Sequence, residues 1–265
     1  MDGEPEMRRR YSRVAVKWIA FLSMFADHFS KILGWPISSR WGIDVRCISI
    51  LGFRWSWLED LGRMAFPLFA FGIAEGSRHT RNPWRYLLRL LAAAVITQPV
   101  YELALARGGN VLFTLAGGLF FIAVFDRWIQ PMQPRPLKGL CAAALFAAVY
   151  FALLLFQCDY WPVGLPLILS FRYLPTERAK KTGAFVLLSV FYLFYATWNG
   201  AGFMLFDPHL TVRLHYVLPW LFAVLSLHFV SDDPPSGRLA GGRWMYLIYP
   251  VHLAVFYGVG LLLAS

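Results

Sequence analysis

The sequence predicts an all-α, polytopic membrane helix bundle, and three observations support this fold class. Hydrophobic residues make up 58% of the 265 residues, and the mean hydropathy is +0.52. Only 15% of the residues are charged, whereas a soluble domain carries about a quarter. Apolar runs of about 20 residues, the length that crosses a bilayer, alternate with short polar loops. We therefore expect one membrane domain over residues 14–265, preceded by a cytoplasmic tail over residues 1–13.

About nine apolar runs follow one another along the chain. The expected spans are residues 14–34, 58–77, 84–106, 110–128, 137–157, 161–174, 182–198, 212–230 and 244–264. Between the first two, residues 35–57 are rich in Trp and Arg, which is typical of an interfacial or amphipathic segment. Alternating crossings place most of the loop Arg and Lys on the side of the N-terminus. The positive-inside rule then predicts that the N-terminus is cytoplasmic.

Several classes of protein are disfavoured by the composition. The net charge of +10 is spread over short loops, so we expect a lipid bilayer and no nucleic acid as the partner of these basic residues. The three cysteines have neither C-x-x-C nor any other metal-ligand spacing, and no metal site is predicted. The sequence also lacks a P-loop and a G-x-S-x-G motif, which argues against an ATPase or a serine hydrolase.

The first apolar run contains ionisable residues, Lys17, Asp27, His28 and Lys31. An ionisable group inside a span costs free energy, so it indicates a functional site by default. Lys17 and His28 are eleven residues apart, which puts them within about 20° on one helix face and about 16 Å apart along its axis. Imidazole gains and loses a proton near neutral pH, so His28 is the candidate general base. Its neighbour Asp27 is a second candidate catalytic residue, although adjacent side chains on a helix diverge by about 100°.

Polar residues on four other expected spans lie at a depth similar to that of His28. His252, after the Tyr249-Pro250 break, is the third candidate catalytic residue. The candidate substrate-binding residues are Asp60, Arg63, Gln98, Asn110, Thr114 and Tyr249. Asp60 and Arg63 are one turn apart and are expected to form an ion pair. The alternative is that this polar layer only holds helices together.

Basic and polar residues also gather around the turn after the second expected span. Together with Lys17 they are Arg78, His79, Arg81, Asn82, Arg85 and Arg89. Such a cluster is suited to binding phosphate groups through charge-assisted hydrogen bonds. The alternative is that these arginines serve only as topology signals.

Several stretches, in order along most of the chain, resemble the TraX family. They are KWIAFLSMFADH, LGRMAFPLFAFGIAEGSRHTRN, NVLFTLAGGL, CDYWPVGLPLIL and YLIYPVHL. The resemblance implies a bacterial inner-membrane acyltransferase of a conjugation system, which uses acetyl-CoA to acetylate pilin. TraX proteins are in turn similar to acyltransferase-3 type enzymes, whose first span has an Arg, ten residues and a His. Here Lys17 and His28 fill that spacing, and Lys lacks the bidentate contact of Arg.

The sequence leaves three hypotheses open. In the first, the basic cluster binds the phosphates of coenzyme A and His28 acts as the general base, while His252, Tyr249 or Gln98 polarises the thioester. In the second, Asp27, His28, Glu75 and His252 form the proton relay of a transporter, although no inverted repeat is evident. In the third, the protein is a non-catalytic membrane subunit that holds pilin or another conjugation protein.

Overall fold

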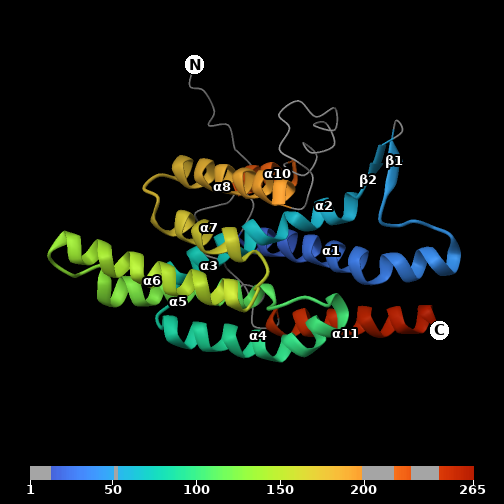
Figure 1. The fold of residues 1–265 in the computed structure, drawn as a ribbon, viewed down its shortest axis with the longest axis horizontal. Coiled ribbons are helices and arrows are strands. Elements are labelled where there is room, and N and C mark those ends of the chain that lie inside the picture. The colour runs from blue at the N-terminus through green and yellow to red at the C-terminus, as the bar shows by residue number, and fades with distance from the viewer. Residues whose placement is uncertain (1–12, 51–52, 199–217, 228–244) are drawn as a thin grey trace, which may run out of the picture.

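The computed structural model of the protein describes residues 13–50, 53–198, 218–227 and 245–265. This part of the chain forms a bundle of α-helices with one short hairpin, which confirms the predicted all-α helix bundle (Figure 1). The tail over residues 1–12 and much of the expected span 212–230 lie outside the described residues.

Most helix bounds agree with the expected spans to within a few residues. The helices are α1 (Arg13–Trp41), α2 (Trp57–Arg63), α3 (Ala65–His79), α4 (Pro83–Leu105), α5 (Val111–Val124), α6 (Arg135–Leu155), α7 (Trp161–Tyr173), α8 (Glu177–Trp198), α10 (Leu218–Ser226) and α11 (Met245–Ala264). A π-helical turn, η1 (Phe125–Ile129), extends α5.

Four segments among the described residues are long and apolar enough to cross a membrane. They are Pro83–Leu105, Val111–Ile129, Arg135–Leu155 and Tyr246–Ala264. The protein is therefore a membrane protein, while the number of nine spans and the side of the N-terminus stay predictions. Helix α1 is longer than any of these segments. It is less apolar because Asp27, His28 and Lys31 lie in its central turns.

Two expected segments differ from the observed elements. Helix α1 continues past Gly34 to Trp41, and the chain returns through an antiparallel hairpin of β1 (Ile48–Ile50) and β2 (Phe53–Trp55). The expected interfacial segment 35–57 is thus a helical extension followed by a hairpin. The run over residues 58–77 is divided at Met64 into α2 and α3. Pro67 explains this break, because proline cannot donate to the carbonyl four residues earlier and its ring clashes with it.

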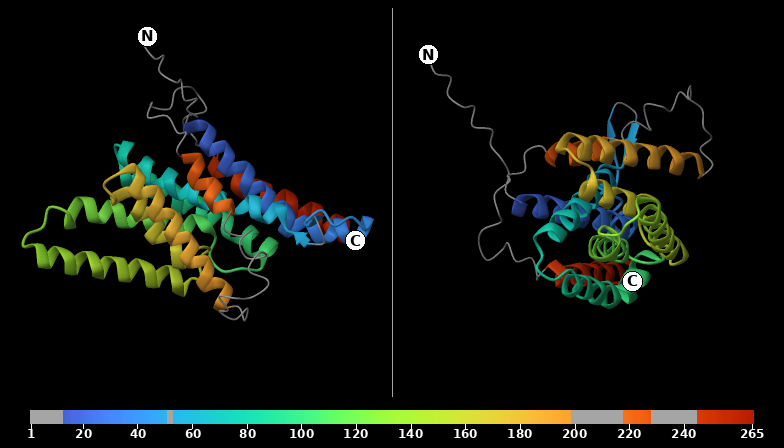
Figure 2. Two further views of the ribbon diagram at one scale, coloured as in Figure 1. Left: turned by 90° about the horizontal axis from the view of Figure 1, so that it is seen from above. Right: turned by 90° about the vertical axis from the view of Figure 1, so that its left-hand side faces the viewer.

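The helices pack in three layers (Figure 1). Helices α8 and α10 lie on one side, α4 and α11 lie on the opposite side, and α1, α3, α5 and α7 fill the space between them. Figure 2 shows α1 and α11 running side by side, and this contact is among the most extensive in the bundle. The middle layer supplies the largest buried cluster, which includes Phe66, Leu119 and Leu167.

Glycine at position 62 lets α2 approach α1 closely. A Cβ atom on Gly62 would lie 2.2 Å from the Cβ of Asp27, a separation that real Cβ atoms do not reach. Any larger residue at this position would push α2 away from α1. This contact sets Glu59 and Arg63 of α2 beside the polar turns of α1.

Candidate active site

His28 of α1 and His252 of α11 meet between their two helices. The Nδ1 atom of His28 lies 2.7 Å from the Nε2 atom of His252. The other ring nitrogen of His252, Nδ1, donates to the carbonyl oxygen of Ile248 at 2.8 Å. Both side chains are buried, with 6% and 4% of their surface exposed. The pair joins two residues that are 224 positions apart in sequence.

Aromatic rings hold the His252 imidazole in place. The ring stacks on Phe25 at a centroid distance of 4.4 Å, and Phe256 meets it edge-on at 5.6 Å. The ring of Tyr249 lies 5.7 Å from that of His28 and is itself buried. A stacked ring and an edge-on ring thus contact the His252 imidazole, so packing as well as hydrogen bonds fixes its orientation.

A polar cavity of about 290 Å³, which we call the histidine cavity, adjoins His28. Six charged residues line it: Asp27, Lys31, Glu59, Arg63, Arg107 and Asp159. The remaining walls are formed by His28 and Tyr160 and by largely apolar side chains that include Met24, Phe66 and Tyr249. The cavity thus combines an imidazole with charges of both signs.

Ion pairs neutralise most of these charges. Lys31 lies 2.7 Å from Asp27, and Arg63 lies 2.8 Å from the buried Asp60, which confirms the predicted Asp60–Arg63 pair. Arg107 lies 3.7 Å from Asp159. Asp27 binds Lys31 and no hydrogen bond joins it to His28 among the described contacts. Asp27 therefore shares the cavity with His28 without orienting its ring.

Three predicted substrate-binding residues hold two turns together instead of lining the histidine cavity. Gln98 accepts from the backbone N–H and the side chain of Asn110 and donates to the Gly108 carbonyl, at 2.8–3.0 Å. Thr114 donates to the Asp159 carbonyl at 2.5 Å. These bonds fix the turn after α4 and the turn before α7. The two turns carry Arg107 and Asp159 into the cavity.

Tyr160, next to Asp159, closes the same side of the cavity. Its ring stacks on Phe66 at 4.0 Å, and its backbone has a positive φ of 59°. Burial, together with the nearby carboxylates of Asp27 and Asp159, raises the pKa of the Tyr160 phenol. Its hydroxyl therefore stays protonated and can donate a hydrogen bond to a bound molecule.

A second cavity of about 520 Å³, the basic cavity, extends along α1 in the opposite direction. Lys17, His79 and Arg89 lie on its wall, together with Thr80 and Tyr86. Its other lining residues are mostly apolar and come from α1, α3, α4 and α5. The helix face of α1 that carries Lys17 and His28 therefore borders two cavities, the basic cavity at Lys17 and the histidine cavity at His28.

The two cavities adjoin each other. Met24, Phe69, Val111 and Tyr249 line both of them. Met24 lies one turn before His28 on α1, so the shared wall is beside the histidine. A thin molecule that entered at the basic cavity would thus meet these four side chains just before it reached the imidazole.

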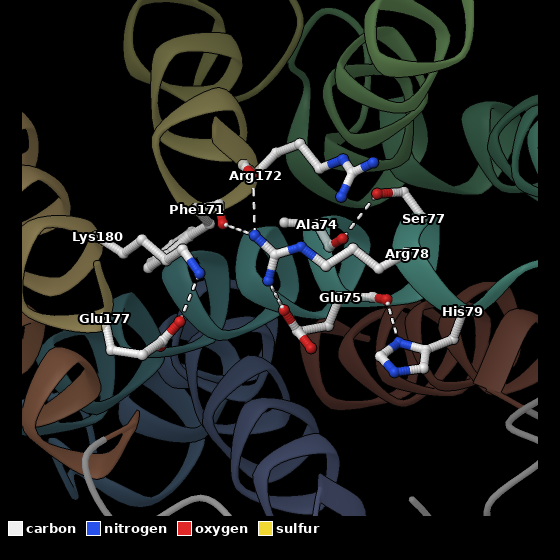
Figure 3. A network of polar contacts seen from close by, with 9 residues as sticks. All are labelled: Ala74, Glu75, Ser77, Arg78, His79, Phe171, Arg172, Glu177 and Lys180. Atoms are coloured by element: carbon white, nitrogen blue, oxygen red, sulfur yellow. Dashed lines mark hydrogen bonds and ion pairs between the residues drawn. The ribbon is translucent and has the colours of Figure 1, made fainter. Parts of the chain in front are cut away.

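Arg78 belongs to a separate group of contacts, which we call the Arg78 network (Figure 3). Its guanidinium pairs with Glu75 and donates to the carbonyls of Phe171 and Arg172, at 2.9 and 2.8 Å. Arg172 in turn pairs with Asp126 of the π-helical turn at 2.7 Å. Arg78 thus caps the end of α7 and joins it to α3.

The remaining members of the predicted phosphate cluster are placed differently. The Asn82 side chain caps α4 by accepting from the N–H of Arg85 at 2.9 Å. Arg81 and Arg85 are exposed and line neither cavity. Of the seven candidates, the structure brings Lys17, His79 and Arg89 together at one cavity. Among the described residues, no three His, Cys, Asp or Glu side chains gather as metal ligands would.

Five charged or hydroxyl-bearing residues of the cavity were absent from the predicted site: Lys31, Glu59, Arg107, Asp159 and Tyr160. One signal for Asp159 exists in the sequence, because it is the only acidic residue between Asp126 and Glu177. Glu59 stands beside Asp60 in a polar turn. No pattern in the sequence singles out Arg107 or Tyr160, since their positions depend on how two turns fold together.

Comparison with known proteins identifies the family. The model of the TraX protein family matches residues 12–260. The chain is 31% identical over 264 residues to a probable fimbrial assembly protein, FimC of serogroup H1, from Dichelobacter nodosus. That alignment covers 92% of this chain and 94% of the relative. No solved structure is recognisably similar. With a family match over nearly its whole length, this chain belongs to the TraX family.

Proposed function

We propose that the protein is an inner-membrane acetyltransferase that moves an acetyl group from cytoplasmic acetyl-CoA to an amine of a pilin subunit. The observation that carries this proposal is the pair of adjoining cavities, one basic and one with His28 on its wall. A donor with a charged head and a long, thin arm fits such a pair, because the two ends of the molecule have different chemistry. The positive-inside pattern supports entry of the donor from the cytoplasm.

The basic cavity fits the donor in charge and in length. Lys17 and Arg89 supply cations for phosphate groups, and His79 and Thr80 add polar contacts. Lys17 and His28 are separated by about 16 Å along α1. The apolar walls between them, which include Ala20, Phe21 and Leu115, suit the pantetheine arm. The thioester would then lie at the wall shared by the two cavities.

His28 would transfer the proton of the reaction. Its imidazole accepts a proton from the acceptor nitrogen as that nitrogen forms a bond to the thioester carbon. It returns the proton to the sulfur as the carbon–sulfur bond breaks, so the products are an amide and the free thiol. Tyr249 lines both cavities and can donate a hydrogen bond to the thioester oxygen. Gln98 lines neither cavity and is already bonded to Asn110.

The family and the relative support a pilus as the context of this reaction. The relative is named as a probable fimbrial assembly protein. An acceptor amine would enter the histidine cavity, where Glu59, Asp27 and Asp159 provide carboxylates for it. Since the cavity holds about 290 Å³, it admits the end of an extended peptide rather than a folded domain.

The protein reconstituted in lipid nanodiscs provides the test. We expect it to bind radiolabelled acetyl-CoA and to release coenzyme A when a synthetic peptide with a free N-terminal amine is added. The same peptide with an acetylated N-terminus is the control and should cause no release. A reconstituted protein that binds no acetyl-CoA would contradict the proposal.

A further inference from the structure

The contact between His28 and His252 determines which nitrogen of each ring carries hydrogen. A carbonyl oxygen can only accept, so the Nδ1 atom of His252, 2.8 Å from the Ile248 carbonyl, must be protonated. In the neutral ring the other nitrogen, Nε2, is then an acceptor. That atom lies 2.7 Å from Nδ1 of His28. Nδ1 of His28 must therefore be the donor, which leaves the lone pair of His28 on Nε2.

The opposite arrangements place like groups against each other. If His252 carried its hydrogen on Nε2, the lone pair of its Nδ1 would face the lone pairs of the Ile248 carbonyl. If His28 carried its hydrogen on Nε2, two nitrogen lone pairs would face each other across 2.7 Å in a buried site. Each of these arrangements leaves buried polar groups without a hydrogen bond, which destabilises the folded protein. When both rings are neutral, only one combination of tautomers gives a hydrogen bond to each of three nitrogens: Nδ1 and Nε2 of His252 and Nδ1 of His28.

We propose that His252 is a positioning residue that holds His28 in the tautomer with an unprotonated Nε2 atom, ready to accept the proton of the acceptor amine. His252 itself touches neither reactant: it lines neither cavity, whereas His28 lines the histidine cavity. Nε2 of His28 has no hydrogen-bond partner among the described residues, as a base that awaits its substrate requires. The orienting chain runs from the Ile248 carbonyl through His252 to His28.

This inference rests on the proposed function for its kinetic consequence, and two substitutions separate orientation from packing. His252→Phe keeps an aromatic ring against Phe25 and Phe256 but removes the acceptor for Nδ1 of His28. His252→Gln loses the ring but can present an amide oxygen near the position of Nε2. A role in packing alone predicts that Phe is the better replacement, whereas a role in orientation predicts that Gln is.

We expect His252→Phe to lower kcat about tenfold, the effect of losing a hydrogen bond of about 1.4 kcal/mol. His252→Gln should keep most of kcat, and the KM for acetyl-CoA should stay the same in both variants because neither touches the donor. Retained kcat in the Phe variant would overturn the proposal. An equal loss in both variants would also overturn it, because the acceptor would then not be what matters.

Nuclear magnetic resonance of ¹⁵N-histidine tests the tautomers without any reaction. The protein contains six histidines, so the signals of the pair are assigned by their absence in His28→Gln and His252→Gln. In the wild-type protein near neutral pH we expect Nδ1 to carry hydrogen in both rings and Nε2 of His28 to be unprotonated. A hydrogen on Nε2 of neutral His28 would overturn the proposal. This result is independent of acetyl transfer, so it decides the inference even if the proposed function fails.

Discussion

The Arg78 network and the histidine cavity are both polar, but their charged groups are used differently. In the network, Arg78 has three acceptors and Asp126 binds both Arg172 and Tyr173. Around the histidine cavity, Nε2 of His28 and the Glu59 carboxylate have no partner among the described residues, although ion pairs surround them. A polar group whose bonds are all made inside the protein stabilises the fold. A polar group that faces a cavity and still has an unused hydrogen-bonding site can act on a substrate.

The largest effect on kcat should come from His28, whose Nε2 atom has no hydrogen-bond partner among the described residues. We expect His28→Gln to lower kcat for acetyl transfer by about 10²–10⁴, the range for loss of a general base. The KM for acetyl-CoA should change little, because the proposed site of the donor phosphates is the basic cavity. Steady-state kinetics in nanodiscs, with coenzyme A release as the signal, measure both parameters.

A matched variant shows whether this loss is specific to His28. His79→Gln changes a histidine at the other cavity, and we expect it to raise KM while kcat is largely kept. If His28→Gln retained near-full kcat, the imidazole would not be the base. The distinction between a reaction site at the histidine cavity and a donor site at the basic cavity would then fail.

A smaller effect should separate two arginines of α4 that lie one turn apart. Both are exposed, but Arg89 lines the basic cavity, whereas Arg85 lines neither cavity. A charge-assisted contact contributes about 1.5–3 kcal/mol, so Arg89→Gln should raise the KM for acetyl-CoA about ten- to hundredfold. Arg85→Gln should leave KM unchanged. Equal effects of the two substitutions would mean that the donor does not enter at this cavity.

The smallest kinetic effect should come from the Arg78 network. Arg78→Gln removes an ion pair and the donors to two carbonyls at the end of α7, so the protein should be less stable. We expect a lower thermal unfolding midpoint in detergent, with the KM for acetyl-CoA kept within a factor of about two. A tenfold rise in KM with unchanged thermal stability would assign Arg78 to the donor site after all.

Sequence patterns identified the residues whose chemistry conflicts with their surroundings. His28 stands out because a polar side chain inside an apolar run needs a reason, and the structure places it at a cavity. The Asp60–Arg63 pair followed from helical spacing and is confirmed at 2.8 Å. The expected span 161–174 differs from α7 by one residue at its end, because aromatic, proline and charged residues bound it on both sides.

Tertiary partners account for what the sequence could not predict. Depth along a helix places Gln98, Asn110 and Thr114 near the level of His28, but depth does not reveal which neighbour a side chain meets. These residues bond to two turns whose approach depends on the whole bundle. For the same reason the sequence pattern groups Arg78 with the phosphate ligands, whereas the structure places it at the end of α7. The i,i+3 spacing of Glu75 and Arg78 predicts their ion pair, but no sequence pattern predicts the contacts of Arg78 with α7.

If the donor reaches His28 through the basic cavity, a side chain that fills this cavity must block donor binding. Gly72 lines the basic cavity, and a Cβ atom there would meet nothing within 4 Å, so Gly72→Leu projects into open space without disturbing the backbone. Gly258→Leu is the matched control, because Gly258 of α11 is equally unobstructed and lines neither cavity.

The measurement is equilibrium binding of acetyl-CoA to the reconstituted wild-type protein and to the Gly72→Leu, Gly258→Leu and His28→Gln variants. We predict that wild type, Gly258→Leu and His28→Gln bind acetyl-CoA with similar affinity. Gly72→Leu alone should bind about tenfold or more weakly, a loss of about 1.4 kcal/mol of binding free energy. Unchanged affinity in Gly72→Leu, with the other variants also unchanged, would contradict entry through the basic cavity, because the donor would then reach the protein by another path.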